Sequence, residues 1–193
     1  MKKQTKLFIL LTLCFESAAL HIHARPFEEY VLAPKLGGSW VMAYEANPRY
    51  RESDDKHVLH MGGITIDFDA LFNHKSGFSF LITNNIYLLI NPMAINNPPA
   101  IPLIPLYSLN FLFGYTHGLG TNFEFTAAAG IGISTFVLSA FAISIPIQLN
   151  FVPYFTEKYG LYISVAENLA YIIESEGIFI NTLNFSIGPS FRL

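Results

Sequence analysis

Apolar and polar residues alternate along most of the chain with a period of two. In residues 141–151, the odd positions are large and apolar, whereas the even positions include Ser144, Gln148 and Asn150. A strand places alternate side chains on opposite faces, but a helix would scatter Gln148 and Asn150 around its surface. The pattern therefore favours strands over transmembrane helices, the alternative raised by two stretches without acidic or basic residues, 76–123 and 125–156.

Turn residues divide the chain into eight strand candidates. They are residues 30–46, 57–70, 77–91, 103–116, 121–137, 140–154, 160–174 and 177–193. Each is at least as long as the ~9–11 residues that a transmembrane strand needs, and an even number of strands closes without a free edge. A soluble sandwich is the alternative, but the polar face here carries Ser, Asn, Thr and Gly rather than charges. We predict an all-β fold, an eight-stranded antiparallel up-and-down transmembrane β-barrel.

The first 24 residues have the organisation of an export signal. Lys2, Lys3 and Lys6 precede an apolar stretch over 7–15, and small residues follow, so cleavage is expected after Ala19 or Ala24. We therefore predict a signal peptide over 1–24, a barrel over 25–193 and a bacterial outer-membrane location. The alternatives are a buried first element of a cytosolic protein and a lipoprotein signal at Cys14, where Leu13 replaces the usual small residue.

The composition of the chain excludes some classes of partner and cross-link. The chain is 52% hydrophobic and 13% charged, against about 25% charged in an ordinary soluble domain. Removal of residues 1–24 leaves eight basic and thirteen acidic residues, a net charge of −5. This balance argues against nucleic acid as a partner. Cys14 is the only cysteine, so the chain forms no internal disulfide.

The last strand candidate ends in a recognisable pattern. Phe185, Ile187, Phe191 and Leu193 occupy alternate apolar positions at the C-terminus. This resembles the C-terminal assembly signal of bacterial outer-membrane barrels, although that signal usually ends in an aromatic residue. The chain as a whole resembles the small barrels of the OmpA, OmpX and OmpW type, and also small spirochaetal barrels. The resemblance implies outer-membrane lipids and the barrel assembly machinery as partners.

Five charged residues have the parity of the inward face. They are Lys35, Asp67, Asp69, Glu124 and Arg192, and we expect them to form one salt-bridge cluster that closes the periplasmic end. Many other inward positions are small, which is compatible with a narrow channel, a ligand cavity or a water-filled but closed interior. Glu167 has the parity of the lipid face, so we expect a β-bulge near Ala166 or a shifted register to turn it inward.

Two functions fit these residues. The uncharged loop 92–102 contains Met93, Ile95, Pro98, Pro99 and Ile101. It could cap a route for apolar molecules, as the OmpW resemblance implies, or bind a host ligand. The first hypothesis is a narrow passive channel or binding barrel for small, including hydrophobic, molecules; the alternative is a non-transporting surface barrel for adhesion or anchoring. Because no nucleophile–base pair, metal motif or cofactor motif is present in the sequence, we expect no enzyme, metal or cofactor.

Overall fold

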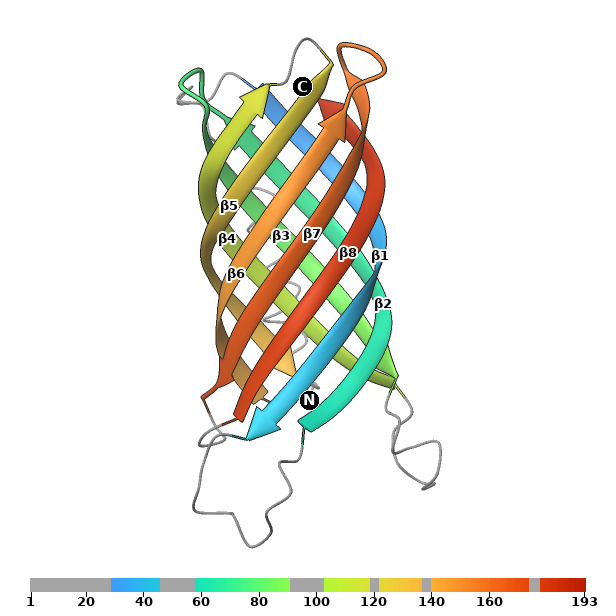
Figure 1. Ribbon diagram of the computed structural model, residues 1–193, viewed down its shortest axis with the longest axis vertical. Coiled ribbons are helices and arrows are strands. Elements are labelled where there is room, and N and C mark those ends of the chain that lie inside the picture. Colours follow the sequence, from blue (N-terminus) through green and yellow to red (C-terminus); the bar gives the residue numbers. More distant parts are fainter. Residues whose placement is uncertain (1–28, 46–57, 91–102, 119–121, 137–139, 174–177) are drawn as a thin grey trace, which may run out of the picture.

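Eight strands form one closed barrel in the computed structural model of the protein (Figure 1). The structure describes residues 29–45, 58–90, 103–118, 122–136, 140–173 and 178–193. The strands are β1 (Glu29–Glu45), β2 (Val58–Asn73), β3 (Phe78–Ile90), β4 (Leu103–Gly118), β5 (Phe123–Phe136), β6 (Ala140–Pro153), β7 (Tyr159–Ile172) and β8 (Ile178–Arg192). The predicted fold class and strand number are confirmed. No helix within the described ranges is long and apolar enough to cross a membrane.

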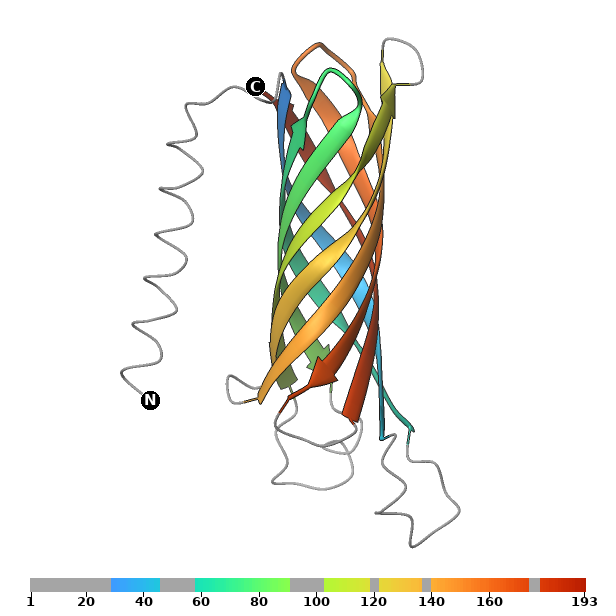
Figure 2. The same ribbon diagram turned by 90° about the vertical axis from the view of Figure 1, so that its left-hand side faces the viewer.

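Every strand pairs antiparallel with its neighbour in the sequence, and β1 also pairs with β8. Leu36 lies opposite Ile187 at this last seam, and Lys35 lies opposite Asp67 on the other side of β1. The strands tilt strongly against the long axis of the barrel (Figure 2). Closure leaves no strand with unpaired backbone groups, which is the condition for a sheet to be stable in a bilayer.

The two ends of the barrel differ in their connections. At one end β2–β3, β4–β5 and β6–β7 are joined by short segments, and β8 also ends there (Figure 1); we call this the turn end and the opposite one the loop end. In the β2–β3 turn, the Gly77 nitrogen donates to the His74 carbonyl at 2.8 Å. Gly77 has a φ of 88°, and a Cβ there would overlap the Tyr115 ring, so glycine is required.

Alternation separates the barrel into an outer apolar face and an inner filled one. Along β6, Phe141, Ile143 and Ile145 point outward and are about half exposed, whereas Ser144 and Gln148 are buried. Comparable outward side chains occur on all eight strands. Such a continuous apolar surface is far larger than the patches that soluble monomers expose, so the outer face needs a covering of lipid.

Aromatic side chains gather on the outer face at both ends. Near the turn end, Tyr159 and Phe191 contact each other with ring centroids 6.0 Å apart. Near the loop end, the Phe179 ring lies between Tyr171 and Tyr44, at 5.1 and 5.6 Å. Rings at both ends are typical of the two girdles that flank the apolar band of a membrane barrel.

Candidate functional site

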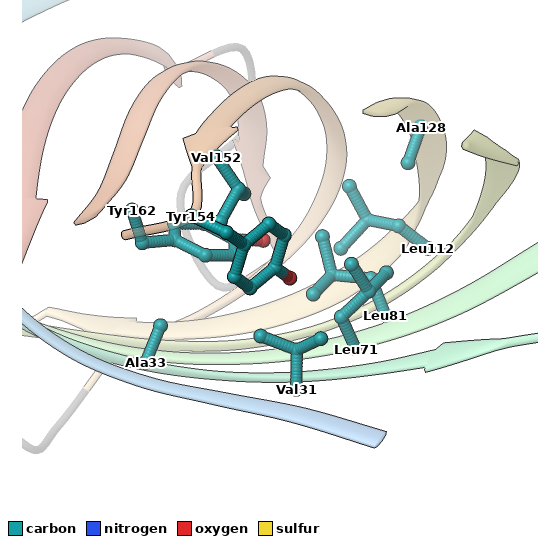
Figure 3. Close-up of a cluster of buried hydrophobic side chains, with 9 residues drawn as sticks. All are labelled: Val31, Ala33, Leu71, Leu81, Leu112, Ala128, Val152, Tyr154 and Tyr162. Carbon is teal, nitrogen blue, oxygen red and sulfur yellow. The ribbon is translucent and has the colours of Figure 1, made fainter. Parts of the chain in front are cut away.

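An apolar layer of side chains fills the barrel near the turn end. Tyr154 and Tyr162 are its largest members, and both side chains lie inside the barrel (Figure 3). The layer consists of Val31, Ala33, Leu71, Leu81, Leu112, Ala128, Val152, Tyr154 and Tyr162. Each of these residues is at most 5% exposed, so the layer leaves no solvent-lined passage along the side chains that form it.

A polar layer fills the middle of the barrel. Its hydrogen bonds join strands that are not neighbours, so the side chains reach across the interior. The Gln148 amide on β6 donates to Asp69 on β2 at 2.6 Å, and the Asn168 amide on β7 donates to Ser108 on β4 at 3.3 Å. Buried polar groups are usually paired, and these bonds pair part of the layer, although one carboxylate oxygen of Asp69 and the amide oxygen of Asn168 have no partner among the described residues.

The polar layer contains a fully buried ionic cluster of Lys35, Asp67 and Asp69. The Lys35 ammonium lies 2.7 Å from Asp69 and 4.0 Å from Asp67, and it also donates to Ser164 at 2.8 Å. Asp67 accepts a further bond at 2.8 Å from the Asn184 amide. The Lys35 side chain is 2% exposed, so water does not compensate these charges. We call this set the Lys35 cluster.

A second apolar layer closes the interior near the loop end. It consists of Val41, Met61, Tyr87, Leu89, Leu106, Ala142, Ala170, Ile172 and Ile180. All nine residues are buried, with Tyr87 at 1% exposure. The polar layer therefore lies between two apolar layers in the described part of the barrel, while the polar side chains of Asn150, Thr126, Thr116, Ser79 and Asn73 continue along one wall toward the turn end.

A second ionic group, the Arg192 cluster, lies at the mouth of the turn end. The Arg192 guanidinium forms ion pairs with Glu29 on β1 and Glu124 on β5, and it stacks 3.7 Å from the centre of the Tyr154 ring. The Tyr154 hydroxyl donates to Glu124 at 3.1 Å. Tyr154 directly follows the last residue of β6. Burial raises the pKa of its hydroxyl, so the hydroxyl stays protonated and remains a donor. The cluster joins the barrel seam to the opposite wall.

The prediction of a single cluster of five charged residues is therefore wrong, because the structure divides them between two separate clusters. The structure brings Lys35, Asp67 and Asp69 together, and it separately brings Glu124 and Arg192 together. Tyr162, 5.2 Å from the Lys35 ammonium, and Tyr154, against Arg192, belong to the apolar layer that separates the two groups. Parity gave the correct face for all five residues, but it carried no information about depth along the barrel.

The small inward residues do not open a lumen. A Cβ on Gly130 would overlap the Phe111 carbonyl, and a Cβ on Gly188 would overlap the Pro34 carbonyl. These glycines thus permit close approach of neighbouring strands, rather than leaving free space. The described interior is filled by side chains, which differs from each of the three interiors that the sequence left open.

Glu167 faces outward, and the expected bulge or register shift is wrong. The pairing of β7 with β6 and β8 runs without interruption past Ala166, with Glu167 opposite Ile147 and Leu183. The Asn181 amide, also on the outer face, donates to the Glu167 carboxylate at 2.9 Å. A local hydrogen-bond partner therefore takes the place of the turn inward that we expected.

Sequence reasoning missed three residues of the clusters. Glu29 has the inward parity of Lys35 but stands before the predicted start of the first strand. Tyr154 and Tyr162 have the inward parity of their strands, but only charged and small residues were considered for the interior. Inward parity, applied to every large residue, would have found all three.

The other predicted residues are placed as follows. Phe185, Ile187, Phe191 and Leu193 all point outward on or just after β8, with exposed fractions of 59%, 47%, 37% and 73%. Met93, Ile95, Pro98, Pro99 and Ile101 and the predicted signal peptide lie outside the described residues. Among the residues that are described, no group of three His, Cys, Asp or Glu side chains could hold a metal ion.

Comparisons with known proteins agree with this architecture. Neisserial surface protein A has 12% identity, covers 84% of this chain and 96% of its own, and superposes with a TM-score of 0.56. OprG from Pseudomonas aeruginosa has 10% identity, covers 87% and 97%, and has a TM-score of 0.53. No curated protein matches the sequence. The chain is thus a small eight-stranded β-barrel of the outer-membrane type.

The family assignment follows from a separate match. Residues 21–193 match the family model described as a domain of unknown function, DUF2715. The chain belongs to this family. The expected resemblance to small eight-stranded outer-membrane barrels is confirmed at the level of the fold.

Proposed function

We propose that the protein is a closed outer-membrane barrel that anchors its loop-end segments at the cell surface. The observation that carries this proposal is the filled interior, in which the polar layer lies between two apolar ones. An eight-stranded barrel is just wide enough to be filled by its own side chains. The likeness to a Neisserial surface protein supports a surface location, and the apolar outer face supports a lipid environment.

Conductance tests the closed interior directly. We expect the refolded protein to give no current in planar bilayers. A variant with Tyr162→Ala and Tyr87→Ala removes the largest fully buried side chain from each apolar layer and should conduct, whereas Tyr162→Phe with Tyr87→Phe should stay closed. Migration that shifts on heating would show that each variant is folded. Ionic current through the unmodified protein would overturn the proposal.

Surface display needs a second experiment. A short epitope placed within residues 91–102 should be reached by antibody on intact cells, and one placed within the β6–β7 turn, at Thr156–Lys158, should be reached only after the outer membrane is opened. The reverse result would contradict the proposed orientation. If residues 91–102 are displayed at the surface as proposed, they can bind a host ligand, the role that the apolar residues of this loop predict.

A gated passage is the second candidate function, and the Lys35 cluster favours it. Ions enclosed in a barrel are costly and are often retained for a functional reason. Asp67→Ala with Asp69→Ala removes both carboxylates that hold Lys35. Conductance that appears in this variant would support a gate, and conductance identical to that of the unmodified protein would reject it.

Assembly by the outer-membrane machinery is proposed from the C-terminal residues. Their outward, alternating arrangement on β8 is one that a receptor could bind before the barrel closes. Phe191→Asn should lower the amount of folded barrel in cells while leaving refolding in detergent unchanged. Equal losses in both settings would show that Phe191 acts only in folding.

A further inference from the structure

The outer face of β7 and β8 carries an acid and an amide inside the apolar band. Glu167 is exposed, and the Asn181 amide donates to it at 2.9 Å. Their strand neighbours are apolar, since Glu167 lies opposite Ile147 and Leu183, and Asn181 lies opposite Leu169. Among the described residues, Glu167 forms no ion pair.

The Glu167 carboxyl group lies on the apolar band of the outer face, between the two aromatic girdles. Tyr171 and Phe179 mark the aromatic girdle at the loop end. Glu167 lies four residues from Tyr171, or roughly 13 Å along the strand at ~3.3 Å per residue, which is roughly 10 Å of depth at a strand tilt of about 40°. Lipid at that depth offers methylene groups only, and a carboxyl group facing them is costly. A partner that brings hydrogen-bond donors would remove this cost.

We propose that this face of β7 and β8 binds a second copy of the same chain, with Glu167 and Asn181 at the centre of the interface. The carboxylate has a second oxygen, and the amide has a second N–H and its own oxygen, so both can bond outside their own chain. A two-fold axis along the membrane normal would place each Asn181 amide against the partner's Glu167 carboxyl.

Self-complementarity is the reason to favour a second copy over another membrane protein. Acceptor and donor lie side by side on one surface, so a two-fold rotation pairs them without any further chemistry. A second copy also inserts in the same direction, so its donors lie at the same depth. Leu169, Leu183 and Ile147 would form the apolar surround, which protects the polar contacts at the centre.

Disulfide cross-linking in bilayers tests the interface. Leu183→Cys places a thiol directly beside Glu167, and Ile133→Cys places one on β5, two strands from β7 and outside the proposed interface. These two positions are matched, because both side chains are apolar, outward and 51% and 53% exposed. Cys14→Ser is included in every variant to remove the native thiol. Oxidation with copper phenanthroline should yield dimers from Leu183→Cys and few from Ile133→Cys.

Removing the pair should abolish the dimer without harming the fold. Glu167→Leu in the Leu183→Cys background should lower cross-linking about tenfold, which is the scale expected for two symmetric hydrogen bonds in a membrane. The same change takes a carboxyl group off the lipid face, so the barrel should refold at least as well. Loss of the dimer could not then be attributed to misfolding.

Three outcomes would overturn the proposal. They are equal cross-linking at Leu183→Cys and Ile133→Cys, cross-linking of Leu183→Cys that survives Glu167→Leu, and an absence of cross-links from either position. In the last case, a lipid that co-purifies with the unmodified protein and is lost with Glu167→Leu would identify a lipid as the occupant instead.

Discussion

The Lys35 cluster and the Arg192 cluster contain the same number of charges of each sign in different surroundings. Each joins one cation to two carboxylates and lies near a tyrosine ring. The Lys35 side chain is 2% exposed, whereas the Arg192 side chain is 25% exposed. Water can replace a lost partner at the mouth but not in the middle layer. We therefore expect the two clusters to differ in the free energy needed to break them.

The largest expected effect is that of Lys35→Met. It leaves Asp67 and Asp69 buried without a cation, and removal of one partner from a buried pair costs about 3–5 kcal/mol. Urea unfolding in lipid vesicles should show this loss in the free energy of unfolding. A loss as small as that of an exposed pair would show that burial does not raise the cost of breaking the Lys35 cluster.

A combined variant is the control for Lys35→Met. Addition of Asp67→Asn and Asp69→Asn removes the uncompensated charges and keeps the shape and much of the hydrogen bonding of both side chains. Most of the lost stability should return, because the cost arises from the unpaired carboxylates rather than from the absence of the lysine. If stability does not return, Lys35 acts mainly through its packing against Tyr162.

The second effect concerns the strand packing beside the Lys35 cluster. A Cβ on Gly188 would overlap the Pro34 carbonyl and come within 2.8 Å of the Lys35 Cα. We expect Gly188→Ala to cost about 1–3 kcal/mol, as overpacking does. Gly62 is the matched control, because nothing lies within 4 Å of its Cβ position. Gly62→Ala should be neutral in the same unfolding assay, and equal effects of the two changes would contradict this account.

Most of the fold could be predicted from the sequence because period two is a local property. The alternation over 141–151 and similar segments fixes which side chains share a face. Short turns then require neighbouring strands to be antiparallel, and an even strand number allows closure. Lys35, Asp67, Asp69, Glu124 and Arg192 were accordingly placed on the correct face.

The arrangement inside the barrel could not be predicted in the same way. The separation of the Lys35 cluster from Arg192 depends on strand tilt and stagger, which set the depth of each residue along the barrel. The alternation of apolar and polar residues gives no information about tilt or stagger. For Glu167, alternation correctly indicated the outer face. The cost of an acid facing lipid nevertheless suggested a bulge, because the Asn181 side chain that offsets this cost lies on a different strand.

The smallest expected effect, that of Arg192→Gln, tests whether exposure alone distinguishes the two clusters. Partly exposed ion pairs contribute about 0.2–1 kcal/mol, and the contact with Tyr154 adds a similar amount, so we expect a loss of about 1 kcal/mol. Because 1 M salt shortens the screening length to about 3 Å, the loss should shrink at high salt. The loss caused by Lys35→Met should not change, since salt does not enter the filled layers. Unfolding curves of both variants at low and high salt separate the cases, and an identical salt response would show that water reaches the Lys35 cluster.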